Sequence, residues 1–315
     1  MAVQYFTVQR SIIMTTKIIS IGNITLGGTG KTPLTIKIGS YFINNGYKVT
    51  ILSRGYKGKI GKSPNVLYDG KKFLYHPPLA ADEPYMIAKN LKNCTVLTGK
   101  NRVATLDISK QLFHPDIAIL DDAFQYRKLE RDVNILLLNH TNPIPTWLPF
   151  PFGYLREFPS SIRRADIIIF TRANSNNIPH KVLKYITNQP VFFSKTSIKE
   201  IMYDKKEIDI GIVKDMTALA FSGIASNNDF FNILHSLDVR LTHKIKFMDH
   251  KGYSDKVIEK ILKLAARKKV DIVITTEKDY VKIPKRYKAD IHFLKIETHI
   301  DQEKDFFDLL MKKIQ

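Results

Sequence analysis

Residues 18–40 read IISIGNITLGGTGKTPLTIKIGS, and the organisation of the whole chain follows from this stretch. The β-branched residues Ile18, Ile19 and Ile21 predict a buried strand, and a segment of helical period follows the glycine-rich loop at 25–32. A strand, a glycine-rich loop and a helix in this order are the context of a P-loop, in which backbone N–H groups turn inward around phosphate oxygens. We therefore predict a nucleotide-phosphate site at this loop.

The loop also contains the side chains that such a site needs. Lys31 can reach the β- and γ-phosphates of a nucleotide, and the Thr32 hydroxyl can bind Mg²⁺. Thr25 departs from the usual pattern, which has its first glycine there. The alternative is a glycine-rich turn with a chance Gly-Lys-Thr sequence, and the preceding strand argues against it. The residues expected to bind the nucleotide are Thr25, Leu26, Gly27, Gly28, Thr29, Gly30, Lys31 and Thr32.

The composition is that of a soluble globular protein with a strong positive charge. The 315 residues suffice for two ordinary domains or one large domain. The 49 basic and 30 acidic residues leave a net charge of +19, which suits a nucleic acid, an anionic membrane surface or a phosphorylated substrate as partner. A generally lysine-rich composition is the alternative explanation. Cys94 is the only cysteine, which excludes an internal disulfide and fits a reducing cytoplasm.

The sequence contains no segment that is expected to cross a membrane. No stretch approaches the roughly 18 uninterrupted apolar residues that a spanning helix needs. Residues 1–17 contain a single arginine among mixed polar residues and lack the order of regions found in a signal peptide. We therefore expect any membrane contact to be peripheral.

Short apolar runs alternate with helical segments along the chain. These runs begin at residues 48, 117, 133, 165, 217 and 270. The strand–helix–strand order is typical of a doubly wound parallel sheet. Two short extended runs near 191–193 and 208–213, separated by a lysine-rich turn, predict a β-ribbon.

We therefore expect an α/β fold with three parts. Residues 1–190 form a P-loop NTPase-like, doubly wound, mostly parallel sheet that binds the nucleotide and holds most catalytic groups. Residues 191–215 form a two-stranded β-ribbon, and residues 216–315 form a smaller α/β lobe.

Two acidic pairs are candidates for magnesium and proton chemistry. Asp121 and Asp122 follow an apolar run, as in a Walker B strand whose carboxylate holds Mg²⁺ directly or through water. Asp82 and Glu83 open a helical segment, where acidic residues often only complement the helix dipole. Opposite a P-loop, this second pair becomes a candidate for binding Mg²⁺ and for accepting a hydroxyl proton.

Three further features have two interpretations each. Arg54 lies in a loop beyond the carboxyl end of a strand, where it would contact phosphate or remain a solvated turn residue. His250 follows Asp249 in a loop and would be structural unless the second lobe folds over the P-loop. The proline- and aromatic-rich residues 143–153 suit acyl chains or a membrane interface, although packing over the core is the default expectation.

Together these motifs resemble the tetraacyldisaccharide 4'-kinase family, also called the lipid A 4'-kinases. The matching segments follow the family's order and extend over nearly the whole chain; they are 22–33, 52–56, 82–84, 121–125, 155–157, 221–225, 249–250 and 275–279. The resemblance implies transfer of the γ-phosphoryl group of ATP to the 4'-hydroxyl of a tetraacyldisaccharide 1-phosphate in lipid A biosynthesis. It also implies two α/β lobes joined by a two-stranded ribbon, with the smaller lobe closing over the active site.

The resemblance implies a role for each matching residue. Asp82 would be the general base, assisted by His250. The residues that hold the ATP phosphates or stabilise the transferring charge would be Lys31, Arg54, Arg102 and Arg156, with Gln125 beside them. The ligands of Mg²⁺ would be Thr32, Glu83, Asp121 and Asp122.

The implied acceptor is an acylated glucosamine disaccharide 1-phosphate at the cytoplasmic face of the bacterial inner membrane. We expect peripheral binding to this anionic surface and no nucleic-acid partner, because the lysines are spread along the chain. Family members usually carry a longer hydrophobic N-terminal helix than residues 1–17 provide, so either a basic and aromatic surface docks the protein or the coding sequence starts upstream. Ala81 and Ala123 replace usual glycines, and we expect a modest backbone adjustment at each.

Two other functions fit parts of the sequence. Another P-loop small-molecule kinase or an amide-forming ligase would keep Lys31, Thr32 and Asp121 but would have no use for an apolar acceptor groove. A basic nucleic-acid-binding module would explain the charge, and it predicts a continuous basic stripe with interleaved aromatic residues. The order of the motifs favours the lipid kinase.

Overall fold

The computed structural model describes residues 15–60, 63–204 and 206–315. The expectation that no signal peptide or anchoring helix opens the chain falls mainly on residues 1–14, which lie outside the described residues. Among the residues that are described, no helix combines the length and the apolar character that crossing a membrane requires.

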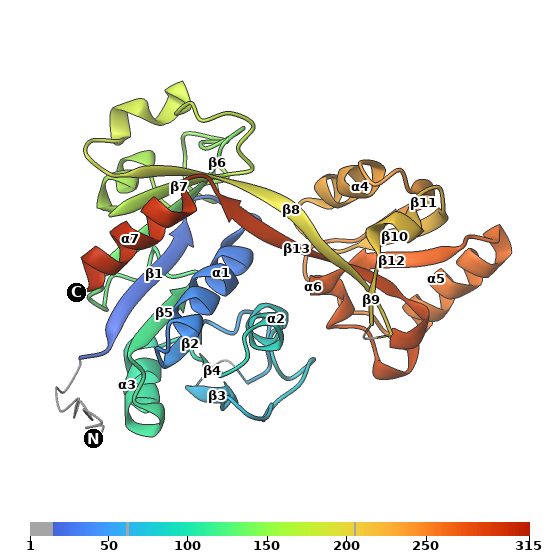
Figure 1. Cartoon of the computed structure of the whole chain (residues 1–315), viewed down its shortest axis with the longest axis horizontal. Coiled ribbons are helices and arrows are strands. Elements are labelled where there is room, and N and C mark those ends of the chain that lie inside the picture. Colours follow the sequence, from blue (N-terminus) through green and yellow to red (C-terminus); the bar gives the residue numbers. More distant parts are fainter. Residues whose placement is uncertain (1–14, 61–62, 205) are drawn as a thin grey trace, which may run out of the picture.

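A mixed sheet extends through two lobes of the described chain (Figure 1). The strands of the first lobe are β1 (Lys17–Asn23), β2 (Val49–Ser53), β3 (Asn65–Tyr68), β4 (Cys94–Thr98), β5 (Ile117–Asp121), β6 (Val133–Asn139) and β7 (Ile167–Thr171). The strands that continue the sheet are β8 (Val191–Tyr203), β9 (Lys206–Ile208), β10 (Thr217–Ser222), β11 (Arg240–Lys246), β12 (Ile272–Thr276) and β13 (His292–Ile300).

The strand order in the sheet is β11-β10-β12-β13-β8-β7-β6-β1-β5-β2-β4-β3, and β9 pairs with β8 beside this path. The pairs β3–β4, β8–β13 and β8–β9 are antiparallel. The other pairs are parallel. The predicted α/β fold with a large, mostly parallel sheet is therefore confirmed.

Helices form most of the connections between strands, because a chain must cross over before it can enter a sheet again in the same direction. The α-helices are α1 (Lys31–Asn44), α2 (Asp82–Asn90), α3 (Arg102–Phe113), α4 (Asn227–His235), α5 (Asp255–Lys268), α6 (Glu277–Tyr280) and α7 (Glu303–Ile314). Short 3-10 helices are η1 (Pro159–Arg164), η2 (His180–Tyr185), η3 (Ile210–Val213) and η4 (Lys285–Asp290).

The central strands of the first lobe are apolar on both faces because the sheet is covered on both sides. Ile19 and Ile119 belong to the core that α1 and α7 cover, whereas Ile18 and Leu120 belong to a second core that includes Leu106 of α3. Successive side chains of a strand point to opposite faces, so a continuous apolar run marks a strand buried on both. This burial explains why the strands before the candidate motifs were easy to predict.

The connection between the lobes differs from the predicted ribbon. The long strand β8 pairs antiparallel with β13, and Figure 1 shows these two strands crossing from one lobe to the other. The run near 208–213 forms only the short strand β9 and the helix η3. The predicted antiparallel pairing of sequence neighbours is present as β8 with β9, but it is short, and the longer ladder of β8 with β13 satisfies more backbone groups.

The C-terminal helix α7 packs on the first lobe, although the predicted boundaries 216–315 place it in the second. Its residues Phe306 and Ile314 belong to the core of the first lobe, and the ring of Phe307 stacks on Tyr41 of α1 with 3.8 Å between centroids. The strand β13 makes this possible by returning the chain across the connection. The division of the chain near 190 and 216 otherwise stays a prediction.

Candidate active site

A cavity of about 1690 Å³ lies between the two lobes. Its wall contains most of the predicted site residues, namely Leu26, Gly27, Gly28, Thr29, Gly30, Lys31, Thr32, Arg54, Glu83, Arg102, Asp121, Asp122, Gln125, Arg156 and His250. The volume exceeds the roughly 300–1,000 Å³ of a typical ligand pocket, so two substrates can share it. Thr25 and Asp82 are predicted site residues that do not line the wall.

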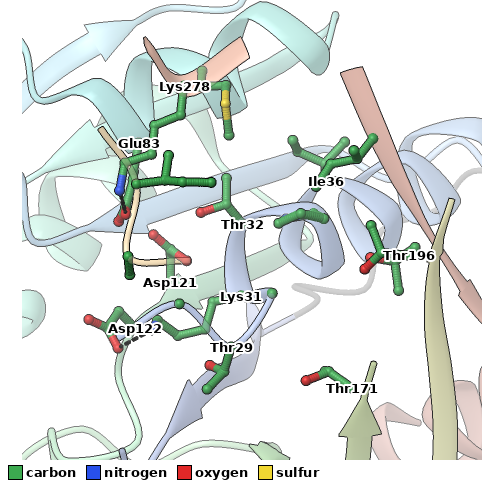
Figure 2. A pocket seen from close by; sticks show the side chains of 18 of the residues that line it. Thr29, Lys31, Thr32, Ile36, Glu83, Asp121, Asp122, Thr171, Thr196 and Lys278 are labelled. Carbon is green, nitrogen blue, oxygen red and sulfur yellow. Dashed lines mark hydrogen bonds and ion pairs between the residues drawn. The ribbon is translucent and has the colours of Figure 1, made fainter. Parts of the chain in front are cut away.

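The glycine-rich loop joins β1 to α1 through the left-handed backbone that glycine adopts easily. Gly27 has a φ of +101°, and Gly30, directly before α1, has a φ of +78°. Lys31 and Thr32 are the first two residues of α1, and both line the cavity (Figure 2). The free N–H groups at the start of this helix therefore face the cavity and make it an anion site.

Thr25 does not line the cavity wall, and its contact with the nucleotide stays a prediction. The residue is buried and forms an antiparallel bridge with Leu155. Its hydroxyl accepts a hydrogen bond from Nδ2 of Asn23 at 3.3 Å. Thr25 is not among the residues with a positive φ, so its backbone does not require a glycine.

Two cations converge on Asp122, directly after β5. Nη1 of Arg156 lies 2.6 Å from Oδ1 of Asp122, and Nζ of Lys31 lies 3.6 Å from the same oxygen. Burial disfavours the charged carboxylate, but the two cations outweigh it and lower the pKa of Asp122. A phosphate that enters the cavity would meet the same two cations.

Asp121 is enclosed in the sheet, and its pKa moves in the opposite direction. Its carboxyl oxygens accept hydrogen bonds from the hydroxyls of Thr35 and Ser53, each at 3.3 Å. Burial, with the charges of Glu83 and Asp122 added to it, raises the pKa of Asp121 to about 7. A cation bound nearby would favour the ionised carboxylate.

Arg102 is buried and holds the backbone at the end of β5. Its Nη2 donates to the carbonyl of Asp121 at 2.9 Å. Burial, with a smaller contribution from the charge of Arg54, lowers the pKa of Arg102 to about 10, so it stays cationic at neutral pH. Arg54 is exposed on the cavity wall, and Nε2 of Gln125 donates to the carbonyl of Asn23 at 2.8 Å.

The second lobe brings His250 to Asp82 of the first lobe, although the two residues are 168 positions apart. Nδ1 of His250 lies 3.1 Å from Oδ2 of Asp82, whose residue is only 8% exposed. Burial alone would raise the pKa of Asp82, but the hydrogen bond from His250 and the charges of Lys278 and Lys282 lower it overall. His250 lines the cavity, and the Asp82 carboxylate lies directly behind its imidazole.

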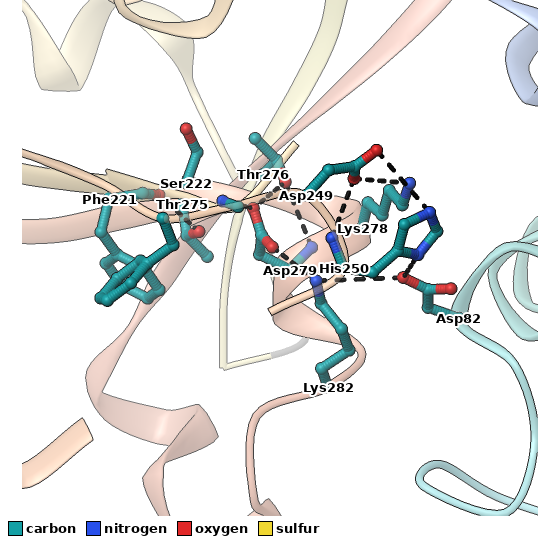
Figure 3. A network of polar contacts seen from close by, with 12 residues as sticks. Asp82, Phe221, Ser222, Asp249, His250, Thr275, Thr276, Lys278, Asp279 and Lys282 are labelled. Atoms are coloured by element: carbon teal, nitrogen blue, oxygen red, sulfur yellow. Dashed lines mark hydrogen bonds and ion pairs between the residues drawn. The ribbon is translucent and has the colours of Figure 1, made fainter. Parts of the chain in front are cut away.

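Lys278, to which the sequence analysis assigned no role, joins the two lobes beside this pair (Figure 3). Its Nζ lies 2.8 Å from Oε1 of Glu83 and 3.3 Å from Oδ1 of Asp249. Burial disfavours the ammonium group, but Glu83, Asp82 and Asp249 together raise the pKa of Lys278. Glu83 is therefore held in place by a cation from the other lobe.

Lys282 is the second lysine that the sequence analysis missed. Its Nζ lies 2.7 Å from Oδ1 of Asp279 and 3.9 Å from Oδ2 of Asp82. A signal was present, because Lys278 and Lys282 are spaced four residues apart directly after a predicted strand. Ligand groups gather in loops at that end of a parallel sheet.

Arg172 connects the P-loop to α4 and was also missed. Its Nη2 donates to the carbonyl of Gly28 at 3.2 Å, and its Nη1 lies 2.9 Å from Oδ2 of Asp229. Ala225 covers the same loop, because a Cβ added at Gly28 would lie 3.7 Å from its methyl group. The second lobe therefore lies directly against the phosphate loop.

The oxygen atoms beside Lys31 fit a magnesium ion. The hydroxyl of Thr32 points toward the side of the cavity where Glu83 and Asp121 lie (Figure 2). Mg²⁺ takes oxygen ligands and is usually held by one or two carboxylates together with substrate phosphates. Burial, and after it the charges of Glu83 and Asp122, raises the pKa of Asp121, and a bound cation would oppose this shift. Within the described residues, no group of three or more His, Cys, Asp or Glu forms a metal site by itself.

Comparisons with known proteins agree with the motifs. A family model described as tetraacyldisaccharide-1-P 4'-kinase (LpxK) matches residues 2–315. The chain is 34% identical over 328 residues to the tetraacyldisaccharide 4'-kinase of Desulfatibacillum aliphaticivorans, covering 100% of this chain and 89% of that protein. It is 32% identical over 323 residues to the protein of the same description from Syntrophus aciditrophicus, covering 97% and 86%.

A solved structure has a similar fold over both lobes. It is the crystal structure of the "apo" form of LpxK from Aquifex aeolicus in complex with ATP. The two chains are 29% identical and superpose with a TM-score of 0.76, over 95% of this chain and 89% of the other.

Proposed function

The chain belongs to the tetraacyldisaccharide-1-P 4'-kinase family, and from this membership we propose how its cleft carries out the family's reaction. The protein is an ATP-dependent lipid kinase of lipid A biosynthesis that phosphorylates the 4'-position of a tetraacyldisaccharide 1-phosphate. The observation that carries the roles below is that Lys31 and His250, with Asp82 behind it, meet at one cavity.

The phosphate side of the cleft, formed by the P-loop and the cations around Asp122, binds and neutralises ATP. Phosphoryl transfer needs positioning and charge neutralisation more than covalent chemistry. Lys31 and Arg156 sit close enough to share one carboxylate, so both can face the β- and γ-phosphates. Arg54 and Arg102 add further positive charge to the same wall.

The base side of the cleft, formed by Asp82 and its contacts with the second lobe, accepts the proton of the acceptor. The O–H bond of the 4'-hydroxyl breaks, its oxygen bonds to the γ-phosphorus, and the bond from that phosphorus to the departing ADP oxygen breaks. Asp82 takes the proton as general base, and its lowered pKa keeps the carboxylate ionised beforehand. His250 assists, because its Nδ1 shares the same carboxylate oxygen and allows the proton to be passed on.

Thr32, Glu83, Asp121 and Asp122 are the residues that would hold Mg²⁺. An ion held there would supply positive charge that offsets the negative charge of the transferring phosphoryl group. Lys278 positions the Glu83 carboxylate through the 2.8 Å ion pair between the lobes. The Asp122 carboxylate is already paired with Arg156 and Lys31, as the Glu83 carboxylate is with Lys278.

We place the enzyme peripherally at the cytoplasmic face of the bacterial inner membrane. Its acceptor carries acyl chains, and the net charge of +19 is attracted to an anionic bilayer surface by about 1 kcal/mol for each nearby Lys or Arg. In this proposal the first lobe binds ATP, the β8–β13 pair connects the lobes, and the smaller lobe closes over the nucleotide.

Mass spectrometry of the lipid product tests the reaction and the acceptor together. The enzyme is incubated with Mg-ATP and tetraacyldisaccharide 1-phosphate in detergent micelles, and the lipid should gain one phosphoryl group at its 4'-position. Asp82→Asn keeps the size of the side chain but removes the base, so it should bind ATP and form little product. Consumption of ATP without a modified lipid would show that the acceptor is wrong.

A further inference from the structure

Large apolar side chains are exposed together on the connection between β6 and η1. Residues 147–158 form this aromatic loop, and its exposed members are Trp147, Leu148, Phe150, Phe152, Tyr154 and Phe158. The exposed fraction reaches 70% for Phe150 and 83% for Phe152. A group of apolar side chains of this size marks an interaction surface rather than ordinary surface variation.

The backbone of the aromatic loop is held in a defined turn by hydrogen bonds within the loop. The N–H group of Phe150 donates to the carbonyl of Leu155 at 2.7 Å. A Cβ at Gly153 would lie 2.1 Å from the carbonyl oxygen of Leu148, so only glycine permits this close turn. The ring of Phe152 therefore projects from a turn in which the N–H groups of Phe150, Phe152 and Tyr154 are already hydrogen-bonded.

The aromatic loop is also attached to the active site. The side chain of Leu155 is fully buried, and the N–H group of Leu26 in the P-loop donates to the carbonyl of Tyr154 at 2.8 Å. The next residue after this anchor is Arg156, whose guanidinium binds Asp122. A surface bound to the aromatic loop would therefore lie beside the mouth of the phosphate side.

The charges around the aromatic loop complement an anionic surface. Nζ of Lys184 lies 5.4 Å from the centre of the Trp147 ring. Glu157 is the only acidic residue between positions 141 and 165, and two arginines pair with it. Tryptophan with a neighbouring lysine is typical of a membrane interface, where the ring sits at headgroup level and the ammonium group reaches the phosphates.

We propose that the aromatic loop inserts into the headgroup region of an anionic lipid bilayer and holds the cleft at the membrane surface. This inference rests on the proposed acylated acceptor, because such a substrate lies in a bilayer with its sugar headgroup at the surface. The aromatic rings supply apolar burial and the neighbouring basic residues supply electrostatic attraction, the two components of interfacial binding.

The fluorescence of Trp147 tests the proposal directly, because it is the only tryptophan of the chain. The full chain is mixed with vesicles of phosphatidylcholine and phosphatidylglycerol in equal parts, without ATP or acceptor. We expect a blue shift of the emission and quenching by lipids with brominated acyl chains. Vesicles of phosphatidylcholine alone should give weaker binding, and added salt should weaken the binding to anionic vesicles.

Paired variants identify the surface that binds. Phe150→Ser combined with Phe152→Ser should weaken vesicle binding by about tenfold or more. The matched control combines Leu112→Ser on α3 with Ile212→Ser on η3, which are comparably exposed, and should bind as the parent does. Both double variants should phosphorylate a short-chain acceptor, soluble as a monomer, at the parent rate, which separates membrane docking from the kinase reaction.

Three results would overturn the proposal. Vesicle binding without a change in Trp147 emission would assign docking to another surface. Equal loss in the loop variant and the control would make the effect non-specific. Absence of binding to anionic vesicles at any salt concentration would remove the docking role altogether.

Discussion

The two sides of the cleft are assembled in different ways. The phosphate side comes from the first lobe alone, because Lys31, Asp122 and Arg156 all lie between β1 and η1. The base side needs both lobes, because Asp82 starts α2 in the first lobe and His250 comes from the second. One side is local in the fold, and the other exists only where the lobes meet.

The two sides also differ in which lobe supplies the groups that balance their charges. On the phosphate side, Lys31 and Arg156 share Asp122, so the cations outnumber their partner. On the base side, Asp82 and Glu83 receive an imidazole and a lysine from the second lobe. We infer that the phosphate side is prepared for an anionic ligand, whereas the base side is completed by protein groups when the lobes are in contact.

Lys31→Ala should cause the largest effect, because it removes the charge that faces the β- and γ-phosphates. We expect kcat to fall by about 10³-fold or more while the thermal unfolding midpoint stays close to that of the parent. Product formation followed by mass spectrometry measures the loss. Lys31→Arg is the matched control, and it should recover part of the activity because it keeps the charge with a different geometry. Near-normal turnover of Lys31→Ala would contradict the role.

Asp82→Ala should lower kcat by about 10²- to 10⁴-fold, the usual contribution of a general base. ATP binding should change much less, because a base acts in the transition state and the phosphate side remains intact. Steady-state kinetics with separate titrations of ATP and acceptor measure both quantities. An unchanged kcat would leave Asp82 as a residue that only starts its helix.

His250→Ala should have a smaller effect on kcat than Asp82→Ala, about tenfold, if the imidazole only assists the carboxylate. The same kinetic measurement compares the two variants directly. A loss as large as that of Asp82→Ala would mean that the proton passes first to His250, which lines the cavity. Unchanged kinetics would make His250 structural.

Lys278→Met tests whether the contact between the lobes is energetically coupled. Combined with Glu83→Gln in a double-mutant cycle, it should show a coupling of about 0.5–3 kcal/mol in the free energy of unfolding in urea. The control cycle uses the exposed pair Lys214 and Asp238, whose atoms are 3.6 Å apart and whose coupling should be small. Equal coupling in both cycles would show that the contact between the lobes is no stronger than a surface ion pair.

Ala81→Gly and Ala123→Gly should have the smallest effects, and they compare the two sides at equivalent positions. Ala81 precedes the base side and has an ordinary φ of −70°, and Ala123 follows the phosphate side without a positive φ. Because neither backbone requires glycine, we expect kcat within about twofold of the parent for both variants. A clear gain in activity at one position would show that alanine strains that side.

The sequence predicted the phosphate side more completely than the base side. Residues 26–32 line the cavity, and Asp121 ends a strand, as the pattern of apolar runs and glycines indicated. Thr25 stays a prediction as a nucleotide-binding residue, because it forms an isolated bridge with Leu155 and does not line the cavity. Lys278 and Lys282 were missed, because a lysine near the end of a strand resembles many solvated lysines until its partners are known.

Local patterns along the chain were sufficient for the α/β class, the phosphate loop and the carboxylates after the strands. The periodicity of apolar residues and the backbone conformations open to glycine are set by a few neighbouring residues, so these features can be predicted from short stretches of sequence. Only the tertiary structure decided three other features, because each is a contact between segments far apart in the sequence. They are the pairing of β8 with β13, the packing of α7 on the first lobe and the contact of His250 with Asp82. Contacts between residues 168 positions apart close a large loop, and that entropy cost is offset only by cores and ladders to which the entire chain contributes.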